Sequence, residues 1–285
     1  MAQLNMASTL ATAIPSVSAA VAAPVYAVAA GVPIACLLST GFGARYAGLS
    51  RPWRRALPVT AVLLVWGAAV LLAIDGGIVL GHVNGVTDVA MPLSWLVPMV
   101  ATLWLLRRLP NVRTALGSAN GMARLASTQV FRNLGLIFLV LHAHGTLPGL
   151  FTYPAAWGDV AAGVTAPVAA WALWYRRTAV ATPGSGWRRF VIGWNVFGFG
   201  EHLVAVFLGT TTFPGPLQLF HTTPTTAVFA ALPMALFPAY LVCFADTLHL
   251  FLLDVLVRDR RREHHAASRN ASSTVETVAA ETVAA

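Results

Sequence analysis

The stretch Trp194-Asn195-Val196-Phe197-Gly198-Phe199-Gly200-Glu201-His202 decides the fold, because it places a carboxylate beside an imidazole inside an apolar segment. That segment, residues 189–209, is long enough to cross the hydrocarbon core of a bilayer as a helix, which takes about 20 residues. A charged side chain at the centre of such a helix costs roughly 2.5 kcal/mol or more, so it is retained mainly where it faces a polar interior. Glu201 and His202 therefore predict a membrane helix that carries a functional site.

The composition of the whole chain indicates a membrane protein rather than a soluble one. Of 285 residues, 57% are hydrophobic and 10% are charged, whereas charged residues make up about 25% of an ordinary soluble domain. All 18 basic residues are arginines. Because the chain has no lysine, a retinal protein with a Schiff-base lysine is excluded. Cys36 and Cys243 both lie in apolar segments, so the sequence predicts neither a disulfide framework nor a cysteine-based metal site.

Seven apolar segments predict an all-α, polytopic membrane protein with seven transmembrane helices. They span residues 17–41, 57–80, 89–106, 130–150, 157–175, 189–209 and 227–257. We expect residues 1–16 to form an external tail, 17–257 the transmembrane domain, and 258–285 a basic and then disordered cytoplasmic tail. No basic region precedes the first segment, so we interpret it as a retained helix, with a cleaved leader as the alternative.

The arginines occupy alternate connections, which predicts the orientation of the protein. Loops rich in Lys and Arg remain on the cytoplasmic side of a membrane. The connections at residues 81–88, 151–156 and 210–226 contain no Arg, and Arg132 is assigned to the inner connection before the fourth helix. We therefore expect the N-terminus outside and the C-terminus inside a cell membrane. Contact with the lipid bilayer accounts for the net charge of +8, and no compact basic domain indicates binding to nucleic acid.

Depth along the helices brings polar groups of three segments near the membrane midplane. We count 1.5 Å per residue from the arginine that flanks each helix, which is Arg132 for the fourth segment. The polar groups that then lie near the midplane are His142, His144, Glu201, His202, Asp246 and His249. Asn195 shares a helical face with His202, and Trp194 shares one with Glu201. Asp246 and His249, three residues apart, also share a face. We expect Glu201, His202 and His142 to line one pocket, with Asp246 or His249 on its wall.

Asp159 is open to two interpretations. It follows Trp157-Gly158 at the outer end of the fifth predicted helix. A carboxylate there can cap the N-terminus of the helix, whose first N–H groups have no partners within the helix. We favour this interpretation, and a role as a catalytic acid beside Glu201, His202 and Asp246 is the alternative.

Several short motifs carry a resemblance to known proteins. They are Arg132-Asn-Leu-Gly135, Gly145-Thr-Leu-Pro148, Pro154-Ala-Ala-Trp-Gly-Asp159, Gly163-Val-Thr-Ala-Pro167, Trp194-Asn195, Gly198 and Pro214-Gly-Pro216. With this spacing, residues 131–256 resemble a group of uncharacterised bacterial integral membrane proteins with seven helices. The resemblance implies a topology and the importance of Asp159 and the sixth helix, but it implies no activity. The chain departs from the pattern before Leu203, where Glu201-His202 stands in place of the usual Asp.

Two classes of function are compatible with the buried polar groups. The first is an enzyme that acts on a lipid-soluble small molecule, for example an isoprenoid, by exchanging protons with it. The second is a proton-coupled transporter or a membrane sensor that uses the same groups. The sequence contains no internal repeat, which favours the enzyme because many transporters consist of two related halves.

The enzyme hypothesis has an acid–base form and a metal form. In the first, the catalytic residues are Glu201, His202, Asp246 and Asp159, supported by Asn195, Trp194 and His249. In the second, the ligands of Zn or non-haem Fe are His142, His144, His202 and Glu201, because imidazole and carboxylate groups suit these metals. A haem held by two of the histidines is a further version of the metal hypothesis.

Overall fold

The computed structural model describes residues 17–75 and 87–258, and every regular element in these two ranges is helical. The elements are α2 (Ala19–Tyr46), α3 (Pro52–Asp75), α4 (Thr87–Arg108), α5 (Pro110–Gly117), α6 (Ala119–Thr128), η1 (Gln129–Gly135), α7 (Leu136–Ala143), α8 (Gly149–Tyr175), α9 (Arg177–Ala181), α10 (Gly186–Thr211), η2 (Ala227–Ala230) and η3 (Phe237–Leu241). The π-helical turn η3 opens a C-terminal helix, Phe237–Arg258. The external tail, the connection at residues 81–86 and the cytoplasmic tail expected from the sequence lie outside the described residues.

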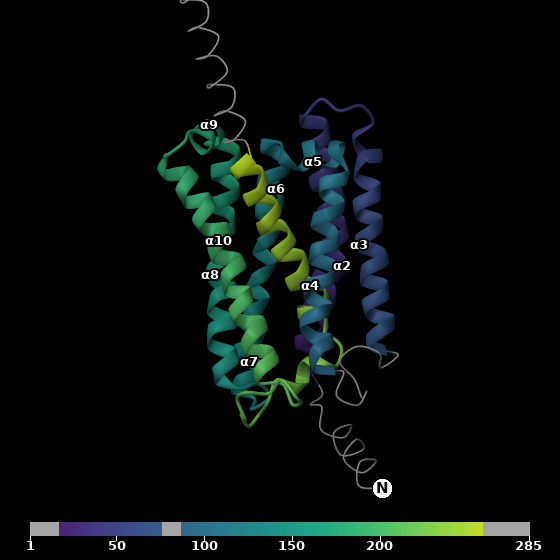
Figure 1. The fold of residues 1–285 in the computed structure, drawn as a ribbon, viewed down its shortest axis with the longest axis vertical. Coiled ribbons are helices and arrows are strands. Elements are labelled where there is room, and N and C mark those ends of the chain that lie inside the picture. Colours follow the sequence, from purple (N-terminus) through teal and green to yellow (C-terminus); the bar gives the residue numbers. More distant parts are fainter. Residues whose placement is uncertain (1–16, 76–86, 259–285) are drawn as a thin grey trace, which may run out of the picture.

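Five helices are long and apolar enough to cross a membrane. They are Ala19–Tyr46, Pro52–Asp75, Ala119–Ala143, Gly186–Thr211 and Phe237–Arg258. The remaining long helices, α4 and α8, run alongside them in the same bundle (Figure 1). The prediction of an all-helical protein with membrane-spanning helices is therefore confirmed for the described part of the chain, while the number of seven crossings stays a prediction.

The helix Ala119–Ala143 differs from the predicted fourth helix, 130–150. It joins α6, η1 and α7 into one interrupted rod that begins earlier and ends earlier than expected. Ser118 caps its start, because its hydroxyl oxygen accepts a hydrogen bond from the N–H of Gly121 at 3.1 Å. Gly145, with a positive φ of 68°, follows its end. The residues of α6 thus belong to the bundle, where they pack against α2 and α8.

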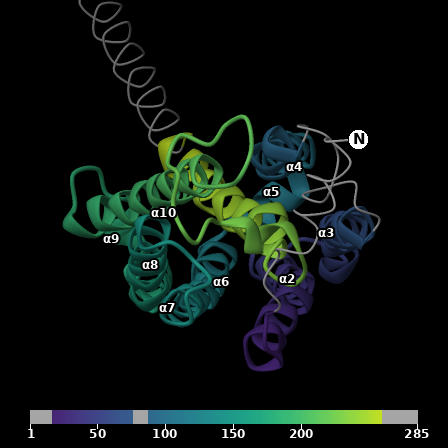
Figure 2. The same cartoon turned by 90° about the horizontal axis from the view of Figure 1, so that it is seen from below.

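The C-terminal helix runs through the centre of the molecule, between the group formed by α6, α8 and α10 and the group formed by α2, α3 and α4 (Figure 2). Its apolar window is 72% buried, whereas that of α3 is 22% buried. Polar side chains on this central helix therefore face other helices of the protein. This is the geometry in which ionisable groups are retained inside a membrane.

The arginine-bearing connections share one end of the bundle. Arg45 lies in the last turn of α2, Arg107 and Arg108 lie in the last turn of α4, and Arg177 begins α9. In Figure 1 these helix ends lie together with α5 and the end of the C-terminal helix, while α7 lies at the opposite end. Two parts of the predicted loop pattern are wrong: residues 151–156 form the first turns of α8, Gly149–Tyr175, and the side chain of Arg132 is buried in the bundle. The orientation in the membrane stays a prediction.

Candidate functional site

Arg132 lies at the centre of the candidate site, on the 3-10 segment η1. Its side chain is fully buried, with 0% exposure. Its Nε donates to Asp159 Oδ1 at 2.8 Å and its Nη1 donates to the carbonyl oxygen of Gly198 at 3.2 Å. Its Nη2 forms an ion pair with Glu201 Oε1. One guanidinium therefore joins η1 to α8 and α10 through two buried carboxylates.

The 3-10 geometry of η1 explains why Arg132 points into the bundle. Side chains three residues apart eclipse each other in a 3-10 helix, and Gln129 and Arg132 are both buried. Both side chains reach the C-terminal helix: Gln129 Nε2 donates to Ala245 O at 3.2 Å, and Arg132 Nη1 contacts His249 Nε2 at 2.9 Å. The interruption of the rod thus presents two polar side chains to the central helix.

His202 lies between carboxylates on both edges of its ring. Its Nδ1 is 2.6 Å from Asp246 Oδ1, and its Nε2 is 3.3 Å from both Asp159 Oδ1 and Glu201 Oε1. Because an ionised carboxylate only accepts hydrogen bonds, these contacts are satisfied when both ring nitrogens carry a proton, or when one neighbouring carboxyl is protonated. The site therefore holds a proton that is shared between one imidazole and its carboxylate neighbours.

Asp246 orients His202 and is itself held by Trp95 of α4. The indole Nε1 of Trp95 donates to Asp246 Oδ2 at 2.6 Å, while Asp246 Oδ1 faces His202. Asp246 is 0% exposed. With both carboxylate oxygens engaged, the Asp246 side chain has one defined orientation, and so has the imidazole that it contacts.

His249 is neutral and positions Arg132. The Asn195 amide nitrogen donates to Val191 O at 2.8 Å, so its Oδ1 accepts from His249 Nδ1 at 3.0 Å. The other ring nitrogen, Nε2, then accepts from Arg132 Nη1 at 2.9 Å. The Trp194 ring packs edge-on against His249, with 5.0 Å between the ring centroids. These contacts fix the tautomer of His249 and hold Arg132 in place.

The charges of the cluster do not balance. The three carboxylates are Asp159, Glu201 and Asp246, and the cations that contact them are Arg132 and, when protonated, His202. Even with His202 protonated, negative charges exceed positive charges by one among these residues. Isolated charge is costly in a medium of low dielectric constant, so this cluster favours binding of one further proton or of a cationic group.

The structure brings together most of the site residues expected from the sequence. Glu201, His202, Asp246 and Asp159 form the cluster, and Asn195, Trp194 and His249 support it. The capping interpretation of Asp159 is wrong, because α8 begins at Gly149 and Asp159 lies well inside the helix. The shared helical faces of Asp246 with His249 and of Asn195 with His202 are confirmed by these contacts.

His142 and His144 do not join the cluster. His142 Nδ1 hydrogen-bonds Leu147 O at 2.8 Å and its ring packs against Tyr153, while His144 is exposed at the C-cap of α7. The predicted depth of His142 was counted from Arg132 as if that arginine lay at the membrane edge. Arg132 itself lies in the core. His142, ten residues later, therefore lies about 15 Å from Arg132 along the rod, near the end of the rod.

Sequence reasoning missed three polar residues of the candidate site, Arg132, Trp95 and Gln129. Arg132 follows a run of arginines assigned to an inner loop, and no local pattern separates a loop arginine from a core arginine. Trp95 and Gln129 are uncharged. The cost of burying a charge in a membrane helix, which identified Glu201, therefore does not apply to them. In the structure, Gly135 lets the Arg132-Asn-Leu-Gly135 segment pack closely against α8, because a Cβ on Gly135 would lie 2.6 Å from Asp159 Cβ. The sequence alone does not show this contact.

The metal hypothesis fits this donor set poorly. Asp159, Glu201 and His202 each offer a ligand atom, all within 4.8 Å of one another. However, Arg132 already donates to Asp159 Oδ1 and forms an ion pair with Glu201 Oε1, so a metal ion would have to displace a buried guanidinium. A haem with two histidine ligands fits no better, because both ring nitrogens of His202 and of His249 have partners.

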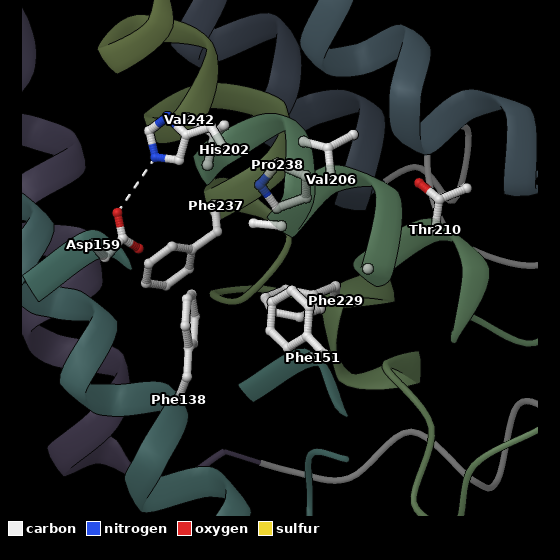
Figure 3. Close-up of a pocket in the computed structure, with 12 residues that line it drawn as sticks. Phe138, Phe151, Asp159, His202, Val206, Thr210, Phe229, Phe237, Pro238 and Val242 are labelled. Carbon is white, nitrogen blue, oxygen red and sulfur yellow. Dashed lines mark hydrogen bonds and ion pairs between the residues drawn. The ribbon is translucent and has the colours of Figure 1, made fainter. Parts of the chain in front are cut away.

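An apolar cavity adjoins the cluster. Asp159 and His202 lie on its wall together with Thr210 and four aromatic rings, those of Phe138, Phe151, Phe229 and Phe237 (Figure 3). The other lining residues are Ala205, Val206, Gly209, Pro238 and Val242. The cavity is therefore a space bounded by hydrocarbon and aromatic groups, with an acid and an imidazole on one side.

Gly198 permits the closest approach within the cluster, and this gives a first prediction. A Cβ on Gly198 would lie 2.4 Å from His249 Nε2 and 2.9 Å from Arg132 Nη1, whereas a Cβ on Gly200 would have no neighbour within 4 Å. We expect Gly198→Ala to lower the free energy of unfolding by about 1–3 kcal/mol, as overpacking does. Gly200→Ala should leave it unchanged or raise it by up to about 1 kcal/mol, because alanine favours helix. Thermal unfolding of the two purified variants checks the difference, and equal stability of both would contradict the packing described.

A family comparison covers the part of the chain that holds this site. The model of a domain of unknown function, DUF8737, matches residues 90–257. The chain belongs to this family. The whole cluster, from Trp95 to His249, lies within the DUF8737 match, whereas α2 and α3 precede it. No curated protein and no solved structure matches the chain.

Proposed function

We propose that this DUF8737 protein is an integral membrane enzyme that exchanges a proton with a lipid-soluble molecule bound in the cavity. One observation carries the proposal: His202, set between carboxylates, forms the wall of an apolar cavity together with Asp159. A shared proton thus lies next to a space that suits an apolar substrate. Proton transfer by a positioned side chain contributes about 100-fold to 10,000-fold to a rate.

The residues of the cluster take different roles in this proposal. Asp159 and His202 line the cavity and are the catalytic residues. Asp246 positions His202, and Arg132 holds Asp159 and Glu201 close together through its contacts with both carboxyl groups. Apart from Thr210, the rest of the cavity wall is apolar, which disfavours the water that would compete for the proton.

Solvent deuterium tests the proposal without knowledge of the substrate. Membranes that contain the protein are incubated in D2O, and their lipid extract is compared by mass spectrometry with that of membranes containing His202→Gln. A proton delivered to carbon leaves deuterium that does not wash out, so we expect labelled species only with the unaltered protein. Identical extracts from membranes with equal amounts of folded protein would overturn the proposal.

A proton-coupled transporter is the alternative, because the excess negative charge of the cluster also suits reversible binding of a proton. The same experiment separates the two, since transport leaves the C–H bonds of a solute intact. For a transporter, proteoliposomes would instead show proton movement that depends on Asp159, without labelled lipids.

The topology within this proposal is seven crossings of the cell membrane with the N-terminus outside. The alignment of α4 and α8 with the five apolar helices and the shared end of the arginine-bearing connections support it. We expect a reporter fused after residue 262 to be cytoplasmic and one inserted at residues 213–222 to be external. Alkaline phosphatase and fluorescent protein fusions measure this, and the opposite location of either reporter would contradict the orientation.

A further inference from the structure

We infer that the cavity beside the cluster stabilises a positive charge on an otherwise apolar substrate, so that the substrate is a hydrocarbon chain with a reactive double bond. The inference rests on the proposed function and names the substrate class of the same site. Three features of the cavity support it: its aromatic wall, the charge of the adjoining cluster, and a hydroxyl group without a hydrogen-bond partner among the described residues.

Four phenylalanine rings form the aromatic wall. The Phe138 ring lies 4.8 Å from Phe237, 5.5 Å from Phe151 and 5.8 Å from Phe229, measured between centroids. The planes of these pairs are inclined by 55° to 81°, so the ring faces point in different directions. The face of an aromatic ring is electron-rich and attracts cations. Such a wall favours a positive charge in the cavity.

The cluster supplies the balancing charge. After His202 or Asp159 has given a proton to the substrate, the carboxylates exceed the cations by one further negative charge. Figure 3 shows both donors on the wall that faces Phe237 and Phe138. A cation formed in the cavity therefore lies between a net negative group and aromatic faces.

Thr210 provides a separate observation that points to a ligand. Its Oγ1 has no hydrogen-bond partner among the described residues, although Thr210 is only 9% exposed and lines the cavity. The adjacent Thr211 and Thr212 hydroxyls donate to the carbonyl oxygens of Phe207 and Leu208, as is usual in helices. In Figure 3, Thr210 lies across the cavity from Asp159. The Thr210 hydroxyl oxygen can therefore contact a positively charged carbon of the substrate, in addition to the contacts made by the cluster.

The reaction that fits these features needs no oxidant or reductant. A proton from His202 or Asp159 bonds to one carbon of the double bond, using the two π electrons, and the other carbon becomes a carbocation. A second double bond of the same chain can attack that carbon and close a ring. Loss of a proton from a neighbouring carbon to the cluster then reforms a double bond and restores the cluster. The product is an isomer of the substrate.

A charged probe and its neutral isostere test the inference. The probe is decyltrimethylammonium, and the isostere is the hydrocarbon in which carbon replaces the nitrogen. Binding of both tritiated compounds is measured by scintillation proximity with purified protein in lipid nanodiscs, and binding to empty nanodiscs is subtracted. We expect the protein to prefer the ammonium probe by at least about tenfold, because aromatic faces and the negative cluster act only on the charge.

Variants of the cavity assign this preference to its wall. Phe138→Leu should reduce the preference about fivefold and leave binding of the isostere unchanged, as expected for the loss of one cation–π contact. Phe229→Leu serves as a second variant if the first does not fold, and Thr210→Val should also reduce the preference. Phe190→Leu is the matched control, because that ring packs against Trp187 away from the cavity.

The outcomes distinguish this inference from the proposed function. Equal affinity of the protein for the probe and the isostere overturns the inference, even if deuterium labelling shows turnover. A preference for the ammonium probe that the phenylalanine variants do not reduce also overturns it, because the charge is then bound elsewhere. A preference that these variants do reduce, without deuterium labelling, supports a site for lipophilic cations and overturns the enzyme.

Discussion

Arg132→Met is expected to lower the free energy of unfolding by about 3–5 kcal/mol, the cost of removing one partner from a buried ion pair. The substitution leaves Asp159 and Glu201 buried, close together and without their guanidinium. It also removes the donor to His249 Nε2 and to Gly198 O. Methionine is unbranched and uncharged but shorter than arginine, so this variant loses the charge, the hydrogen bonds and some packing volume together. Thermal and chemical unfolding of the purified protein, followed by tryptophan fluorescence, measures it.

Arg124→Met is the matched control for this experiment. Arg124 lies on the same rod, half-buried, with its guanidinium 4.2 Å from the centroid of the Phe42 ring, a contact worth about 0.5–1 kcal/mol at an exposed site. Neutralising the carboxylates in the triple variant Arg132→Met, Asp159→Asn, Glu201→Gln should recover most of the lost stability, because the uncompensated charge is then gone. If Arg132→Met and Arg124→Met are equally stable, the ion-pair network does not hold the bundle together.

The helices were predictable from the sequence because their signal is local. An apolar run of about 20 residues is favourable in lipid only as a helix, whatever its neighbours. The run 189–209 therefore corresponds closely to α10, Gly186–Thr211. The fourth helix was misplaced because α6 has little apolar character of its own: Arg124 and Asn120 interrupt it, and it is buried by contacts with α2 and α8 that no local pattern reveals.

The candidate site was partly predictable for an energetic reason. Glu201 and His202 lie in a segment where charge is costly, so partners for them had to exist. Helical periodicity then placed Asp246 and His249 on one face of the C-terminal helix, and both contact the cluster. The sequence did not reveal Arg132, because its inward direction depends on the 3-10 geometry of η1 and on the packing of η1 against α8, which no local pattern shows.

Asp246→Asn is expected to reduce deuterium transfer by about 100-fold to 10,000-fold, the range of general acid–base catalysis, while the protein remains folded. Asp246 accepts from two donors, His202 Nδ1 at 2.6 Å and Trp95 Nε1 at 2.6 Å. Asparagine offers one acceptor and one donor in the same shape. The asparagine NH2 group must then face either Trp95 Nε1 or His202 Nδ1, both of which are donors. Facing His202, the NH2 group can donate only if Nδ1 loses its proton, which is a change of tautomer.

That change of tautomer is the physical reason for the expected loss. With the amide nitrogen facing His202, Nδ1 must lose its proton to accept a hydrogen bond, and the proton of the neutral ring moves to Nε2. The imidazole then cannot hold protons on both edges, so the shared proton of the cluster is lost. A lost buried hydrogen bond also costs about 1–3 kcal/mol of stability, which thermal unfolding separates from the loss of activity.

Trp95→Phe and His142→Gln complete the test. Trp95→Phe removes one donor to Asp246 without changing the charge, so deuterium transfer should fall less than in Asp246→Asn. His142 lies at the end of α7, where its side chain hydrogen-bonds Leu147 O. His142→Gln should therefore leave deuterium transfer unchanged. Full activity of Asp246→Asn would show that the orientation of His202 does not matter to the reaction, and Glu201 or Asp159 alone would then have to supply the proton.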